Sequence, residues 1–181
     1  MLVGCWLAGG VVGRRGSVVY KNREWIVSES KKSLGLSAEI KEAVFRLSEV
    51  ETTDESQDDV KVDIQINDLI RGSAHDLPDA CEHYLYASEF DGYVNMGGFD
   101  GFIGNRGDEV ERFAEALEVI GAPLHAGLAR KAAEIAVNSG LSEESRAEAY
   151  EELWDRFQDC GPTTCRARFR FAVSNAASFF E

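Results

Sequence analysis

The chain has 181 residues, of which 44% are hydrophobic, and it carries a formal net charge of −13. This length fits one domain with a small appendage, and the apolar content excludes a wholly disordered chain. The sequence contains no apolar run of about 18 residues, so a membrane-spanning helix is not expected.

Negative charge is concentrated after residue 50. Residues 1–50 contain eight basic and five acidic side chains, whereas residues 51–181 contain eleven basic and twenty-seven acidic ones, a balance of −16. Such a domain repels nucleic acid and anionic membranes, so we expect it to bind neither directly. Its electric field favours basic partner proteins, although an acidic surface also serves simply to keep a protein in solution.

Residues 1–35 are predicted to form a loose N-terminal segment. Its apolar stretch, residues 2–12, is followed rather than preceded by the first basic residues, Arg14 and Arg15, which is the reverse of a secretory signal. The cytoplasm is therefore the expected location. Two β-prone runs around a short polar turn within residues 17–27 favour a small hairpin.

Residues 36–181 are predicted to form a single helical domain. Ser37 is a suitable N-cap for a helix over residues 37–50. The acidic, apolar-poor stretch 51–59 is expected to be a mobile loop. Residues 60–66 alternate apolar and polar side chains, which is typical of a strand, and their direct continuation into residues 67–70 leaves a helix as the alternative.

Helical patterns dominate from residue 77 onward. Pro78 suits the first turn of a helix that should end near Gly97 and Gly98. Four further helices are indicated by apolar residues at helical spacing. Their predicted apolar faces are Val110, Phe113, Leu117 and Ile120; Leu124, Leu128, Ala132 and Ile135; Ala147, Tyr150, Leu153, Trp154 and Phe157; and Phe169, Val173, Ala176 and Phe180. The fold class is therefore predicted to be mainly α, a compact antiparallel helical bundle with the small N-terminal hairpin as an addition.

Residues 93–105, which read YVNMGGFDGFIGN, resemble the signature of the bacterial DNA-mimic protein family. The resemblance continues through residues 116–122 and the last aromatic helix, and it covers about residues 77–181. It implies a mainly helical, often dimeric protein whose carboxylates imitate DNA phosphates and occupy a transcriptional regulator. Tyr93, Met96 and Gly101 depart from the Glu, Asn and Gln of the signature, so any site that these positions line is altered here.

The residues of this motif also have a physical interpretation, which is mainly structural. Adjacent glycines permit a positive φ, so one helix can stop and the next begin within a few residues. Polar side chains can then cap exposed backbone groups, and aromatic side chains can anchor the corner in the core. A ligand pocket is the alternative. The motif residues are Asn95, Gly97, Gly98, Phe99, Asp100, Phe102 and Asn105.

One predicted helix carries an acidic stripe opposite its apolar face. Its five acidic residues fall within about 80° of one another and rise about 4.5–6 Å per step along the helix, comparable with phosphates along a DNA strand. Like charges at this spacing destabilise a helix, so we predict a partner-binding surface. The alternative is an ordinary solvated face that Arg146 and Arg156 partly neutralise. The stripe consists of Glu144, Glu148, Glu151, Asp155 and Asp159.

Other groups of polar residues are not expected to perform chemistry. His75, Asp76, Asp79, Cys81, Glu82 and His83 lie close in sequence but lack a recognised ligand spacing, so no metal site is predicted. The sequence has no nucleophile motif, phosphate loop or cofactor fingerprint, so we expect no catalytic residues, no cofactor and no enzymatic activity. The basic run Arg166, Arg168 and Arg170 should pair with acidic neighbouring helices rather than bind RNA.

These observations favour an acidic protein-binding module that resembles a DNA mimic. Its expected partner is a transcriptional regulator or another basic DNA-binding protein. The alternative is an immunity or inhibitor protein that neutralises a basic toxin such as a nuclease, which would use the same acidic surface. A third hypothesis, a small hydrolase or ligand-binding domain, would need a pocket at the glycine corner.

Overall fold

A computed structural model describes residues 18–21, 24–27, 33–50, 56–73, 77–161 and 163–180. It divides into two units, residues 1–31 and residues 32–181, which we describe separately. In the first unit, strands β1 (Val18–Lys21) and β2 (Glu24–Val27) pair antiparallel, with Val18 opposite Val27. The two strands coincide with the two β-prone runs of the sequence.

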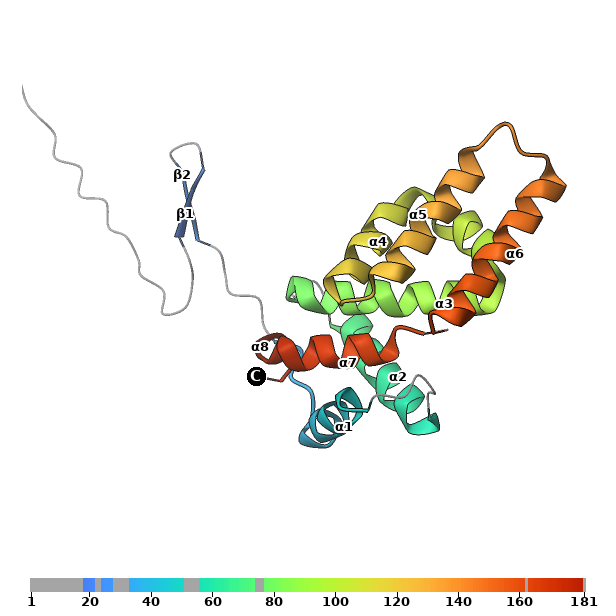
Figure 1. The fold of residues 1–181 in the computed structure, drawn as a ribbon. Helices are drawn as coiled ribbons and strands as arrows, with labels where there is room; N and C mark the ends of the chain where they lie inside the picture. The colour runs from blue at the N-terminus through green and yellow to red at the C-terminus, as the bar shows by residue number, and fades with distance from the viewer. Residues whose placement is uncertain are drawn as a thin grey trace, which may run out of the picture. The chain divides into compact units, whose positions relative to one another are not determined.

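The second unit is helical, which confirms the predicted fold class (Figure 1). None of its helices, within the described ranges, has the length and apolar character needed to cross a bilayer. The helices are α1 (Ala38–Ser48), α2 (Gln57–Gly72), α3 (Asp79–Arg106), the 3-10 turn η1 (Gly107–Glu109), α4 (Val110–Val119), α5 (Pro123–Val137), α6 (Glu143–Asp159), α7 (Cys165–Ser174) and α8 (Ala176–Phe179).

The strand predicted for residues 60–66 is wrong, because this stretch lies inside helix α2. Apolar residues at every second position also contain pairs four residues apart, and such pairs share one helix face. Val62 and Ile66 are buried in this way, whereas Val60 and Ile64 lie on the exposed side. The alternation therefore reflects two helix faces rather than two faces of a sheet.

The acidic loop predicted for residues 51–59 is also partly wrong. Its first five residues lie outside the described part of the chain, but residues 57–59 form the first turn of α2. Ser56 and Asp59 form a capping box, in which the Ser56 backbone N–H donates to the Asp59 carboxylate at 2.6 Å. Acidic side chains are favourable at a helix N-terminus. Asp58 and Asp59 in the first turn therefore stabilise α2.

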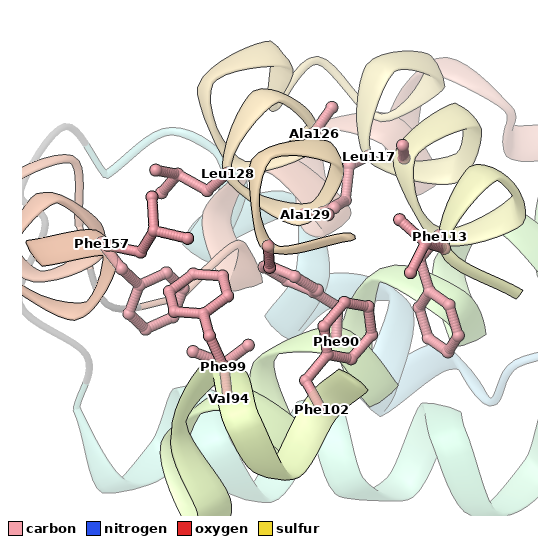
Figure 2. Close-up of a cluster of buried hydrophobic side chains, with 14 of the residues drawn as sticks. Phe90, Val94, Phe99, Phe102, Phe113, Leu117, Ala126, Leu128, Ala129 and Phe157 are labelled. Carbon is pink, nitrogen blue, oxygen red and sulfur yellow. The ribbon is translucent and has the colours of Figure 1, made fainter. Parts of the chain in front are cut away.

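Helix α3 is central to the unit and bends at Gly98, whose φ of 64° and ψ of −172° are not helical. Residues before the bend and after it contribute to one aromatic core with α4, α5 and α6. Figure 2 shows Phe90, Phe99, Phe102 and Phe157 gathered in this core. The ring of Phe90 contacts that of Phe102 edge to face at 5.2 Å. Each such ring stabilises the fold by roughly 1.5–3 kcal/mol through burial.

A second core joins the two ends of the helical unit. It contains residues of α1, α2, the start of α3, α7 and α8, with Val44, Ile66, Tyr84, Phe169 and Phe179 fully or almost fully buried. The backbone at residues 34 and 36 hydrogen-bonds to carbonyl oxygens of residues 178 and 179. The segment from residue 33 onward is thus attached to the helical unit.

Several residues assigned to apolar faces differ from prediction. Leu124 is 68% exposed and Ala147 is also exposed, because each lies at the edge of its helix's buried face. The last predicted helix is two helices, α7 and α8, separated at Asn175. This break turns Phe179 into the core, whereas Phe180 is only partly buried.

Candidate protein-binding surface

Helix α6 has one side anchored in the aromatic core. Ser142 caps the helix by accepting a hydrogen bond from the Ser145 backbone N–H at 3.1 Å. Tyr150, Leu153 and Phe157 are buried, and the Phe157 ring contacts the Phe99 ring perpendicularly at 6.1 Å. Because these contacts fix the rotation of α6, they also determine which side chains face the solvent.

All five residues of the predicted acidic stripe are exposed on α6. Among the described residues, no ion pair includes any of these carboxylates, and none includes Arg146 or Arg156. The helix exposes two further acids, Glu143 and Glu152, that lie outside the stripe. These two acids lie outside the arc of about 80° that defines the stripe. The exposed side of α6 is therefore a row of carboxylates that form no ion pair within the described part of the chain.

The glycine corner, Gly97 and Gly98, lies at the bend of helix α3. Gly98 adopts the positive φ, and Phe99 and Phe102 enter the core. The Nδ2 atoms of Asn95 and Asn105 donate to carbonyl oxygens four residues earlier in α3, at 2.9 and 2.7 Å. These bonds are of the local side-chain-to-backbone type open to short amides.

A cleft of about 540 Å³ separates the glycine corner from α6. Gly97, Gly98, Phe99 and Asp100 line one side of it, and Glu143, Arg146, Ala147, Tyr150, Glu151 and Trp154 line the other. Burial and then the charge of Asp100 raise the pKa of the Tyr150 hydroxyl above its usual value. The structure thus brings Glu151 of the stripe next to four motif residues, whereas Glu144, Glu148, Asp155 and Asp159 do not line this cleft.

Another surface depression, which the sequence did not predict, lies between α2 and α3. It is an open groove of about 650 Å³, lined in part by Asn67 and Arg71 of α2. The three positions that depart from the family signature, Tyr93, Met96 and Gly101, also line it. The three differences from the family signature were the only sequence signal for a site at this position. They could not define the groove, because its other side is formed by residues of α2.

A buried ionic network connects α7 with α2 and α3. The Arg168 guanidinium donates to Asp63 Oδ2 at 2.9 Å and also contacts Asp91. Burial disfavours the charged form of Arg168, but the two carboxylates outweigh that effect and raise its pKa. The Tyr84 hydroxyl donates to Asp63 at 2.7 Å, and burial followed by this charge raises the Tyr84 pKa.

The predicted pairing of the basic run with acidic helices is confirmed for two of its three arginines. Arg168 pairs as described above, and Arg166 forms a bidentate pair with the buried Asp59 carboxylate, at 2.6 and 3.0 Å. Arg170 instead donates to the backbone carbonyls of Ser48 and Val50. The three arginines therefore connect α7 to α1, α2 and α3.

The residues considered as metal ligands are only partly described, since His75 and Asp76 lie outside the described ranges. Within those ranges, no three His, Cys, Asp or Glu side chains are grouped to hold a metal ion. Burial raises the pKa of the Cys81 thiol to about 12, so this thiol is neutral at physiological pH. Cys160 and Cys165 are separate thiols.

Comparison with known proteins places the chain in a family. The family model described as DMP19-like protein matches residues 75–167, just over half of the chain. The match includes the glycine corner and all of α6, and it supports the resemblance to DNA-mimic proteins at the level of the family. No curated protein and no solved structure matched in the same comparisons. The chain belongs to the DMP19-like protein family.

Proposed function

We propose that this protein is a non-catalytic binding protein that imitates DNA and occupies the DNA-binding surface of a basic protein. The observation that carries the proposal is the acidic stripe of α6, in which five carboxylates are exposed and have no ion pair with any residue that the structure describes. A helix that only needed solubility could alternate its charges, which would also stabilise it. The stripe instead accumulates one sign of charge.

The geometry of the stripe suits a surface that normally binds phosphates. Successive carboxylates follow one side of α6 with a rise of about 4.5–6 Å per step. Arginine and lysine side chains that bind DNA phosphates can bind carboxylates through the same charge-assisted hydrogen bonds. The balance of −16 over residues 51–181 adds a long-range field that accelerates association with a basic partner.

Membership of the DMP19-like family supports the same proposal, because the matched residues include the whole of α6. A transcriptional regulator or another DNA-binding protein is therefore the proposed partner class.

The proposal is tested by capture followed by competition. The tagged full-length chain is incubated with extract of its native host at low salt, bound proteins are released with salt, and they are identified by mass spectrometry. We expect a basic DNA-binding protein whose operator or nonspecific DNA is displaced by this chain at equimolar concentration. A captured protein that binds this chain and DNA simultaneously would contradict mimicry. A basic toxin whose nuclease activity is inhibited would establish the immunity role instead.

A further inference from the structure

The cleft beside α6 contains a tyrosine hydroxyl that the fold does not use. Tyr150 lines the cleft, while most of its side chain is packed in the aromatic core, so that 7% of the residue is exposed. Its hydroxyl has no hydrogen-bond partner among the described residues, and it is not closed to solvent as the Nε atom of Arg146 is. A phenylalanine would fill the core equally well. The hydroxyl is therefore available to a molecule that enters the cleft.

The charges that act on this hydroxyl show that it faces the cleft. They belong to Asp100 and Arg146, and both residues line the cleft. Burial raises the pKa of the Tyr150 hydroxyl most, and the charge of Asp100, which also raises it, outweighs that of Arg146, which lowers it. The hydroxyl thus lies in a negative local potential, where a positively charged group is stabilised.

The charged side chains that line the cleft have the same overall sign. Asp100, Glu143 and Glu151 are acidic and exposed, whereas Arg146 is basic, which leaves a balance of −2. No ion pair among the described residues includes any of these four. Since Glu151 also belongs to the acidic stripe, the cleft continues the surface proposed for partner binding. A cation from that partner is the occupant that complements it.

Trp154 determines which cation fits best. Its indole lines the cleft and is partly buried, and it packs against the Phe157 ring with 5.7 Å between the centroids. A guanidinium is planar, so its face can stack on an indole while its N–H groups reach acceptors at its edge. It is also more weakly hydrated than an ammonium, so it loses less hydration on entering a cleft. Both properties favour arginine over lysine.

We propose that the cleft binds an arginine side chain of the basic partner. The guanidinium stacks on the Trp154 indole and donates to the Tyr150 hydroxyl oxygen. Its other N–H groups donate to the carboxylates of Asp100 and Glu151. The proposal rests on the proposed function, because the arginine belongs to the protein that the acidic stripe recognises. The cleft adds selectivity, because the stripe attracts positive charge along α6 whereas the cleft requires one arginine beside Glu151.

Arginine binding is tested without the partner, by NMR titration of the full-length chain with the peptide acetyl-Gly-Arg-Gly-amide. The titration is run at about 0.15 M salt, which screens unspecific attraction to exposed acids. We expect saturable shifts of the Trp154 indole N–H and of the backbone amides of Phe99 and Asp100. The lysine peptide should bind about threefold more weakly, and the uncharged citrulline peptide at least about tenfold more weakly. Equal binding of either peptide, or shifts along α6 without the Trp154 indole, would overturn the proposal.

The Tyr150 hydroxyl is tested by a variant that leaves every charge in place. Tyr150→Phe should weaken binding of the arginine peptide by about threefold or more, because one hydrogen bond to a charged group is lost. Its melting temperature should not fall, since the hydroxyl has no partner in the fold. Tyr86→Phe is the matched control, because its hydroxyl contacts Glu109 outside the cleft. Unchanged binding by the Tyr150 variant, or equal weakening in both variants, would refute the assigned contact.

Charge variants distinguish a cation site from an anion site. Arg146→Gln removes the base from the cleft, so arginine binding should become tighter, and weaker binding would contradict a cation site. Asp100→Asn should weaken binding several-fold. Asp155→Asn makes the same change at an exposed position of α6 that does not line the cleft, and it should have a smaller effect. Equal effects of these two variants would indicate attraction to the acidic surface as a whole and would overturn the proposal.

The peptide titration and partner capture fail independently. If the peptide binds at Trp154 but no basic DNA-binding protein is captured, arginine binding stands and DNA mimicry is contradicted. If such a partner binds through the stripe but the peptide causes no shift at Trp154, the cleft assignment alone is overturned. We expect both to succeed, with Tyr150→Phe lowering the affinity for the partner as well as for the peptide.

Discussion

Gly97 and Gly98 are adjacent but have different backbone requirements. Gly98 has φ 64° and ψ −172°, a region that is essentially restricted to glycine, whereas Gly97 is helical. Gly98→Ala should therefore lower the free energy of unfolding by about 1–3 kcal/mol. Gly97→Ala should leave it unchanged or raise it by up to about 1 kcal/mol, because alanine favours helix. Urea denaturation of both variants is the measurement, and equal losses would contradict the bend at Gly98.

Arg168 balances two buried carboxylates, and its own side chain is 3% exposed. Arg168→Met leaves Asp63 and Asp91 without their cation and should destabilise the protein by about 3–5 kcal/mol. Arg170→Met is the matched control, because Arg170 is exposed and donates to the backbone carbonyls of Ser48 and Val50. Chemical denaturation should separate the two variants clearly, and similar stabilities would show that the network is not essential.

The Cys81 thiol gives a pH dependence with a defined sign. Burial is the main cause that raises its pKa from an ordinary 9.0 to about 12, and the charge of Glu82 adds to the effect. Below pH 9 the thiol is protonated in both states, so its contribution to stability is complete. Between pH 9 and about 12 the unfolded chain releases the proton first, so stability falls. Cys81→Ala should show a shallower loss of melting temperature from pH 8 to 10, whereas parallel curves would contradict this assignment.

Helix α2 shows where sequence periodicity is ambiguous. Positions 60, 62, 64 and 66 form an alternating pattern that fits a strand, but 62 and 66 also lie one helical turn apart. The capping box at Ser56 and Asp59 was the local signal that could have decided for a helix. The acidic composition of residues 51–59 instead favoured a loop, so the capping box was not recognised as the start of a helix.

An isoleucine pair tests the assignment of α2 directly. Ile66 is fully buried and Ile64 is 52% exposed. Ile66→Ala should cost about 2–5 kcal/mol of unfolding free energy, whereas Ile64→Ala should change it by about 0.5 kcal/mol or less. In a strand both side chains would lie on one face and both variants would be destabilised alike. Thermal or urea unfolding distinguishes these outcomes.

The helices of the C-terminal part were predictable because each carries its own boundaries and apolar face. Gly121, at φ 87°, ends α4, and Pro123 begins α5. The exposed face of α6 was predictable for the same reason, because the spacing of residues within one helix determines which of them share a face. The groove could not be found like this, because Asn67 and Gly101 become neighbours only through packing of α2 against α3. The sequence also did not predict which acidic residues would form ion pairs with Arg168.

Charge is distributed unevenly between inner and outer positions of the helical unit. Asp59, Asp63 and Asp91 are buried and paired with arginines, so they contribute to folding and little to the external field. The carboxylates of the acidic stripe on α6 are exposed, and no ion pair among the described residues includes them, so they contribute to the field that a partner meets. We therefore expect that the acidic stripe can be altered without loss of the fold.

The central claim concerns partner binding by this stripe, and one comparison of two charge-matched variants tests it. Glu148→Lys, Glu151→Lys and Asp155→Lys together reverse the stripe. Glu39→Lys, Glu42→Lys and Glu49→Lys make the same change of charge at exposed positions on or beside α1. Both variants should fold, as circular dichroism would verify.

The measurement is the Kd for the captured basic partner, determined by isothermal titration calorimetry at several salt concentrations. We predict that the α6 variant loses affinity by about 100-fold or more at low salt, that the α1 variant loses less than about tenfold, and that wild-type affinity decreases steeply with salt. Equal affinity of the α6 variant and the wild type at low salt would remove α6 from the interface and contradict the account.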